Sequence, residues 1–187
     1  MTTVNSGDIV SILVPPWHVQ IAAHCASKRL HAIGRRDRPD YRNKAALQPE
    51  PIANLAACLC ELAVSLYYDR RWNGPYWEMK YHREANLLPD VGECIEVRRT
   101  RTLRGGGVPV KQSEASKGYW LVQAYVSDDV LSSVYKKERC DTTVTLTGQV
   151  LAEVAWNNGA QRYPEKRVCP AELLRPVNPC EVCTCSN

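Results

Sequence analysis

The 187-residue sequence contains no phenylalanine, so Trp, Tyr and Leu must supply the bulk of any hydrophobic core. No segment approaches 18 consecutive apolar residues, which argues against a membrane-spanning helix. The N-terminal stretch MTTVNSGDIVSILVPPW lacks the basic region, the apolar core and the small-residue cleavage site of a secretory signal peptide. These absences predict a cytoplasmic protein without a membrane partner.

Several motifs of well-known enzyme classes are also missing. The sequence has no internal repeat, no Walker-type loop, and no GxGxxG or GxSxG motif. The composition, 44% hydrophobic and 24% charged residues, is that of a folded globular protein. The net charge of +4 permits nucleic-acid binding without requiring it.

The length and the hydrophobic pattern predict a single domain at 1–176, followed by a Cys-rich tail at 177–187. Strands are expected near 8–14, 76–81, 94–98, 119–127 and 141–153, the last with a bend at Gly148. Helices are expected at 16–32 and 51–68, with a short helical piece or loop at 132–139. The fold class is therefore mixed α/β (α+β).

The stretch Leu87–Thr100, LLPDVGECIEVRRT, carries the clearest chemical pattern. Ile95 and Val97 alternate with Glu96 and Arg98, so a strand here presents the apolar pair on one face and the charged pair on the other. Asp90 lies just upstream. Carboxylates beside a cation can hold a divalent metal against a phosphate.

The segment 51–68 is apolar nearly all round and predicts a buried helix, in which Glu61 is the only charged residue. An ionised carboxylate in the middle of such a helix is costly unless it is paired or binds a cation. Two interpretations of Glu61 stay open. In the structural one it faces a groove or pairs with an arginine. In the functional one it binds a metal or orients a residue that does.

Two basic segments could contact phosphates. One follows the strand and contains Arg98, Arg99, Arg101 and Arg104 before three glycines; the alternative there is a charge-protected edge strand. The other is the loop at 34–44, which contains Arg35, Arg36 and Arg38 and could equally be a solvated connection.

The nine cysteines of a cytoplasmic protein are expected to be reduced. The tail sequence CxxCxC, with Cys169 upstream, supplies four thiolates in Cys169, Cys180, Cys183 and Cys185, which is enough for tetrahedral zinc. Free thiols on a loose end are the alternative, because the usual paired CxxC spacing is absent.

Taken in order, these pieces resemble the PD-(D/E)XK nuclease-like superfamily, and in particular small uncharacterised phage and prophage proteins of that type. The pieces are VPPW at 14–17, CELAVSLYY at 60–68, WNG at 72–74, PDVGECIEVR at 89–98 and LLRP at 173–176. The resemblance covers most of the chain up to Pro176 and leaves the Cys-rich tail outside.

The resemblance implies a three-layer core with a mixed central sheet flanked by helices. It makes Glu61 the helix carboxylate, Asp90 and Glu96 the Mg²⁺-binding acids together with the carbonyl of Ile95 or Val97, and Arg98 the residue at the usual lysine position. The implied chemistry is Mg²⁺-assisted hydrolysis of a DNA phosphodiester.

The residues set two conditions on that chemistry. Asp90 and Glu96 can share a metal only if the chain turns sharply between them, and Gly92 is the residue that would allow it, with Glu93 as a competing ligand. Arg98 cannot deprotonate at neutral pH, so a proton-shuttling lysine would have to be Lys80 or Lys111.

The leading prediction is a phage-type DNA-binding protein with Mg²⁺-dependent nuclease activity where the acids converge. The rival is a catalytically degenerate module that binds nucleic acid or a host or phage protein. In that rival, Arg98 would pair with Glu96 or Glu61 and fill the site.

Overall fold

The computed structural model describes residues 3–6, 9–34, 50–76, 88–103, 106–138 and 141–182. In chain order they form β1 (Thr3–Ser6), β2 (Ile9–Val14), α1 (Pro16–Gly34), α2 (Glu50–Tyr68), the 3-10 turn η2 (Gly74–Tyr76), β3 (Ile95–Thr100), β4 (Val108–Lys111), α4 (Gln112–Ala115), β5 (Trp120–Tyr125), α5 (Asp128–Tyr135), β6 (Thr142–Leu151), α6 (Ala152–Asn158), β7 (Ala160–Tyr163), β8 (Lys166–Cys169), the 3-10 turn η3 (Ala171–Leu173) and α7 (Pro179–Val182). The strand predicted at 76–81 lies outside the described residues, apart from its first position.

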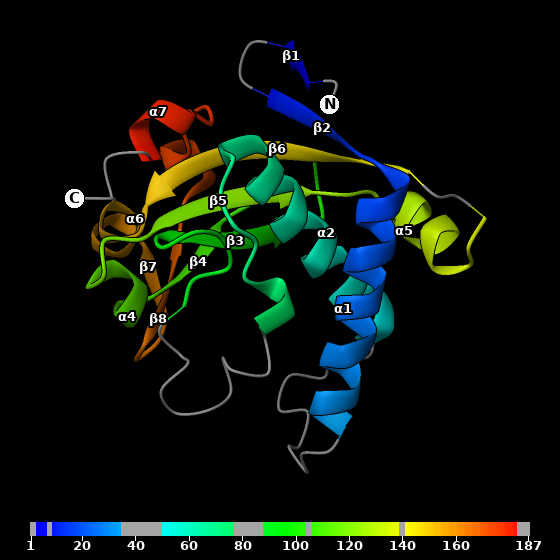
Figure 1. Cartoon of the computed structure of the whole chain (residues 1–187). Helices are drawn as coiled ribbons and strands as arrows, with labels where there is room; N and C mark the ends of the chain where they lie inside the picture. The colour runs from blue at the N-terminus through cyan, green and yellow to red at the C-terminus, as the bar shows by residue number, and fades with distance from the viewer. Residues whose placement is uncertain are drawn as a thin grey trace.

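The larger sheet is mixed, as the sequence predicts (Figure 1). Its five described strands run in the order β1-β2-β6-β5-β3. β3 pairs with β5 in parallel, and all the other neighbours are antiparallel. Gly148 marks an irregularity of register between β5 and β6, at the bend that the sequence places there. β3, which carries Glu96 and Arg98, is therefore the last strand at one end of the sheet among the described residues.

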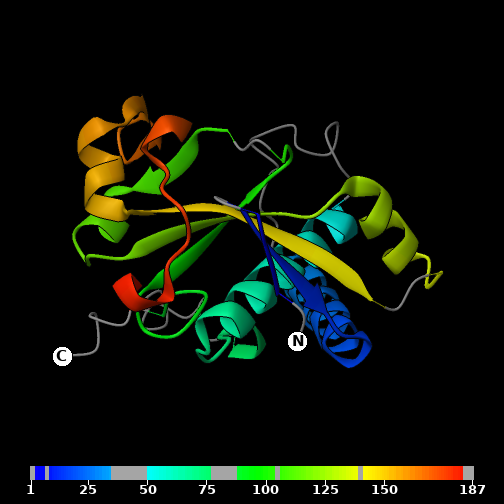
Figure 2. The same ribbon diagram turned by 90° about the horizontal axis from the view of Figure 1, so that it is seen from above.

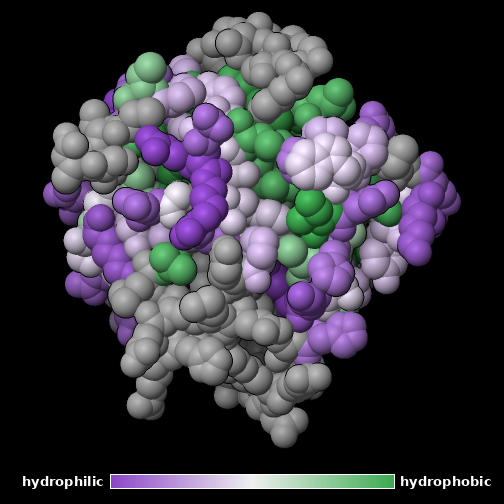
Figure 3. All heavy atoms as spheres, in the orientation of Figure 1, coloured by the Kyte–Doolittle hydropathy of each residue, from purple (hydrophilic) through white to green (hydrophobic). Residues whose placement is uncertain are grey.

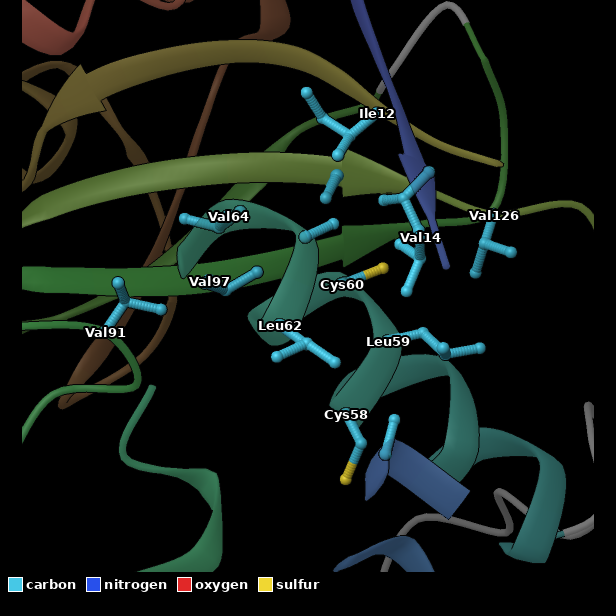
Figure 4. Packing of buried hydrophobic residues seen from close by; sticks show 14 of the residues in the cluster. Ile12, Val14, Cys58, Leu59, Cys60, Leu62, Val64, Val91, Val97 and Val126 are labelled. Carbon is cyan, nitrogen blue, oxygen red and sulfur yellow. The ribbon is translucent and has the colours of Figure 1, made fainter. Parts of the chain in front are cut away.

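α1 and α2 cover one face of the larger sheet (Figures 1 and 2). α2 is buried on nearly all sides, and Leu59, Cys60 and Val64 interdigitate with sheet residues such as Ile12 and Val97 (Figure 4). Each fully buried aliphatic side chain contributes about 1.5–3 kcal/mol relative to an exposed one. The Ala- and Leu-rich composition of 51–68 thus produces the central helix of the core.

The opposite face of the sheet is covered by a second sheet and α6 rather than by helices alone. This sheet has the order β4-β8-β7. Its residues Val108 and Val110 pack with Leu121 of β5 and Val150 of β6 in a second apolar cluster. The sequence did not predict these strands, because each is only four residues long and β7 and β8 are largely polar.

The described part of the C-terminal segment packs on the domain. It runs across the larger sheet beside β6 (Figure 2), and Val177 and Val182 are buried in the main core. Fully buried Gln149 fastens it: its side-chain oxygen accepts from the Tyr68 hydroxyl at 2.6 Å and from the Asn178 N–H at 3.1 Å. Residues 177–182 therefore belong to the packed structure, while 183–187 lie outside the described residues.

One described helix meets the length and composition expected of a membrane span. Pro51–Tyr68 has a mean hydropathy of 1.3, and 61% of it is buried inside the fold. A buried core helix produces the same signal, which makes it weak evidence for a membrane. The cytoplasmic location stays a prediction.

Candidate functional site

A tight hairpin brings Asp90 and Glu96 together at the start of β3. The Val91 N–H donates to the Ile95 carbonyl at 3.0 Å, and the Ile95 N–H donates back to the Val91 carbonyl at 3.2 Å. Gly92 lies in the turn with a φ of 56°, in the left-handed region that favours glycine. Asp90 and Glu96 flank the bonded pair and are cross-strand neighbours. The turn that the sequence required at Gly92 is present.

Asn73 fixes this hairpin from the side. Its fully buried side-chain amide donates to the carbonyls of Pro89 at 3.0 Å and Gly92 at 2.8 Å. Its backbone N–H donates to the Asp90 carbonyl at 2.9 Å. A buried amide without these partners would be costly, so Asn73 holds the hairpin in one position. The sequence showed Asn73 only as part of a turn, because its partners in the hairpin lie more than 15 residues away.

The α2 side of β3 carries a buried ion pair. Glu61, 6% exposed, accepts two hydrogen bonds from the Arg29 guanidinium, at 2.8 and 2.5 Å, and one from the Trp72 indole N–H at 3.0 Å. A Cβ on Gly74 would lie 2.1 Å from the Trp72 ring, so only glycine fits there. Of the two readings left open for Glu61, the structure shows the arginine partner.

Burial raises the pKa of Glu61, and the charge of Asp90 adds to the rise, whereas Arg29 and Trp72 oppose it by stabilising the carboxylate. Arg29 itself is 5% exposed. Arg29 cannot lose its charge by deprotonation in a protein, so it needs the Glu61 carboxylate as its buried partner. The pair is therefore a structural element whose two halves depend on each other.

Arg98 is the centre of a second cluster on the opposite face of β3. Its Nη1 donates to the Glu96 carboxylate at 3.2 Å and to the Val97 carbonyl at 3.1 Å. Its Nη2 contacts the Glu114 carboxylate at 2.6 Å, and its Nε donates to the Pro109 carbonyl at 2.9 Å. Burial alone would lower the pKa of Arg98, but the surrounding carboxylates outweigh it and raise the pKa.

Glu114 is the site residue that sequence reasoning missed. It is 3% exposed and is held by Arg98, by the Lys111 ammonium at 3.1 Å and by the Lys111 N–H at 3.0 Å. Burial would raise the pKa of Glu114, but Arg98 and Lys111 outweigh it and lower the pKa. The polar segment KQSEASKG around it gives no sign that its glutamate is buried.

Asp90 lies beside β3 and is linked to both of these clusters. One of its carboxylate oxygens accepts from the Val97 N–H at 2.9 Å. Burial is the larger cause of the raised pKa of Glu61, and the charge of Asp90 is the second. The same charge contributes to the raised pKa of Arg98. Asp90 is thus electrostatically linked to both faces of the strand.

The three acids implied by the resemblance do not form one ligand set. Val97 faces α2, where Glu61 lies, so the alternation of β3 directs Glu96 to the opposite face. Within the described ranges, no group of three His, Cys, Asp or Glu side chains is arranged to hold a metal. The Glu96 carboxylate and the Val97 carbonyl, two atoms that a metal would use, both accept from Arg98. Arg98 therefore holds two of the groups that Mg²⁺ would need, and the Mg²⁺ site stays a prediction.

The arginines predicted to contact nucleic acid divide into two groups. Arg99 is 14% exposed in its side chain and pairs with Asp128 at 2.9 Å, and Arg101 is exposed. The others, together with Lys80, lie outside the described residues: Arg35, Arg36, Arg38 and Arg104. The geometry does not test whether these residues contact phosphates, and that role stays a prediction.

The zinc ligands predicted in the tail are likewise only partly described. Cys169 is fully buried in the second apolar cluster, where burial raises the pKa of its thiol and disfavours the thiolate that zinc requires. Cys180 is exposed on α7. Cys183 and Cys185 lie outside the described residues, so the zinc site stays a prediction.

Comparison with protein-family models, with curated proteins and with solved structures gives no match for this chain.

Proposed function

We propose that the chain is a PD-(D/E)XK-like nucleic-acid-binding module whose acidic site is held closed by an arginine. The order of the acids in the sequence, the mixed sheet and the helix that carries Glu61 support the relation to this superfamily. The basic net charge of +4 supports a polyanionic partner.

The observation that carries the proposal is the position of the Arg98 guanidinium. It contacts Glu96, Glu114 and two main-chain carbonyls, so one fixed cation pairs with both carboxylates. Arginine keeps its charge at every physiological pH, and this side chain is 15% exposed. This arrangement matches the degenerate alternative set out from the sequence, in which Arg98 fills the site.

Mg²⁺-dependent hydrolysis of DNA is the second candidate, favoured by the hairpin that sets Asp90 beside Glu96. That hairpin depends on Gly92 in its turn and on the hydrogen bonds of Asn73. The two candidates differ in one respect that can be measured: only the hydrolase needs both acids.

The test measures binding and cleavage in one set of samples. The wild type and the variant Asp90→Asn/Glu96→Gln are incubated with labelled single- and double-stranded DNA and Mg²⁺ or Mn²⁺, and binding is followed over a salt series. The proposal predicts binding that weakens steadily as salt rises, because phosphate contacts release counterions, and no cleavage.

Two results would contradict it. Cleavage by the wild type that the double variant lacks would establish the hydrolase instead. Absence of any salt-sensitive binding would remove nucleic acid as the partner and leave protein interaction.

A further inference from the structure

A row of two lysines and a tyrosine crosses the second sheet. Lys111 of β4 is the register partner of Lys166 of β8, and Lys166 is the partner of Tyr163 of β7. Directly paired residues of antiparallel strands point to the same face, so the three side chains form one line about 10 Å long across two strand spacings. The sequence did not reveal this row, because the second sheet itself was not predicted.

The row lies on the outer face of that sheet. The alternate residues of β4, Val108 and Val110, are fully buried in the second apolar cluster, whereas Pro109 and Lys111 are exposed. All four residues of β7 are exposed, and Tyr163 is 58% exposed. The side of the molecule that carries α4, β7 and β8 is covered mainly by hydrophilic residues (Figure 3, left).

A cavity of about 400 Å³ lies beside the two lysines. It is lined by Lys111, Gln112, Ser113, Ser116, Glu165 and Lys166. These residues supply ammonium, hydroxyl and amide groups and a single carboxylate. Such groups suit an anion that accepts hydrogen bonds, and a phosphate is the common biological example.

The two ammonium-bearing residues are paired on neighbouring strands at the edge of this cavity. The Lys111 ammonium is anchored by Glu114, which in turn binds Arg98, so Lys111 is fixed at the surface end of the Arg98 cluster. A phosphate in the cavity would lie beside Lys111 and Lys166 without displacing that anchor.

We propose that this row binds a single-stranded stretch of nucleic acid, with Lys111 and Lys166 on backbone phosphates and Tyr163 stacked on a base. An exposed aromatic next to cations is the combination that single strands require, because their bases have free faces for stacking. In a duplex the bases are stacked on one another, and Tyr163 would have none to bind. The inference rests on the proposed function and assigns its partner and its surface.

The test is the affinity for labelled oligo(dT) over a salt series, with two pairs of variants. Lys111→Gln/Lys166→Gln is compared with Lys136→Gln/Lys137→Gln, which removes the same charge from exposed lysines at the end of α5. Tyr163→Ala is compared with Tyr135→Ala, an exposed tyrosine of similar accessibility at 54%. Thermal melts of all four variants check that each one is folded.

The inference predicts that losing both lysines lowers the slope of log affinity against log salt by about 1.4, or about 0.7 per phosphate contact. It predicts that Tyr163→Ala weakens binding about tenfold or more, and that both control variants bind as the wild type. If the wild type binds oligo(dT) and each variant behaves like its control, this surface is wrong and the proposed function stands. If the wild type does not bind DNA of any form, both proposals fall.

Discussion

Replacing either half of the Arg29–Glu61 pair is expected to destabilise the fold by about 3–5 kcal/mol, because the partner is left as an uncompensated buried charge. Both side chains are more than nine-tenths buried, and Glu61 also accepts from the Trp72 indole. Urea unfolding of Arg29→Met and Glu61→Leu measures the loss. The expected consequence is a shift of the midpoint to lower urea with little change in slope.

The double variant Arg29→Met/Glu61→Leu serves as the control. Apolar residues of similar volume often replace a buried ion pair without loss, so the double variant should recover most of the stability that each single variant loses. A loss below about 1 kcal/mol in the single variants would show that the pair is not the buried contact described above, or that water reaches it.

Arg98→Met is expected to cost a similar amount at pH 7, about 3–5 kcal/mol, because buried Glu114 loses its 2.6 Å contact with a cation and Glu96 loses a hydrogen bond from it. The loss should depend on pH. In the wild type the pKa of Glu114 lies below its usual value of 4.5. Its contribution to stability is therefore fully present above that value and is lost as the pH falls through the lower, folded-state pKa.

Without Arg98, burial should raise the pKa of Glu114. As the pH falls, Glu114 then takes up a proton, and the variant no longer bears the cost of burying its charge. The difference in unfolding free energy between wild type and Arg98→Met should therefore be largest at neutral pH and shrink on acidification towards pH 4. Urea titrations at a series of pH values test this, with Arg98→Met/Glu114→Gln as the variant expected to lose the pH dependence. A difference that is constant with pH would show that Arg98 does not act through Glu114.

The sequence predicted the parts of the fold that have strong periodic patterns. The alternation of Ile95 and Val97 with Glu96 and Arg98 places each residue on its correct face, and the apolar run at 51–68 is the buried helix. Gly92 was identified as the residue that could turn the chain. Each of these features is local, so a short window of residues is enough to define it.

What the sequence missed depends on contacts between distant segments. The partner of Glu61 comes from α1, 32 residues away, and buried Glu114 of α4 pairs with Arg98 of β3. The second sheet consists of four-residue strands whose polar residues show no alternation strong enough to detect. No local pattern specifies these features, since their stability comes from tertiary packing.

The most direct test of the central claim, that Arg98 occupies the place of a metal, is a calorimetric titration of Mn²⁺ into the wild type and Glu96→Gln at pH 7. The account predicts no saturable binding by either protein up to about 1 mM, a Kd that corresponds to about 4 kcal/mol. Binding tighter than this by the wild type, lost in Glu96→Gln, would contradict it and establish a metal site at Asp90 and Glu96.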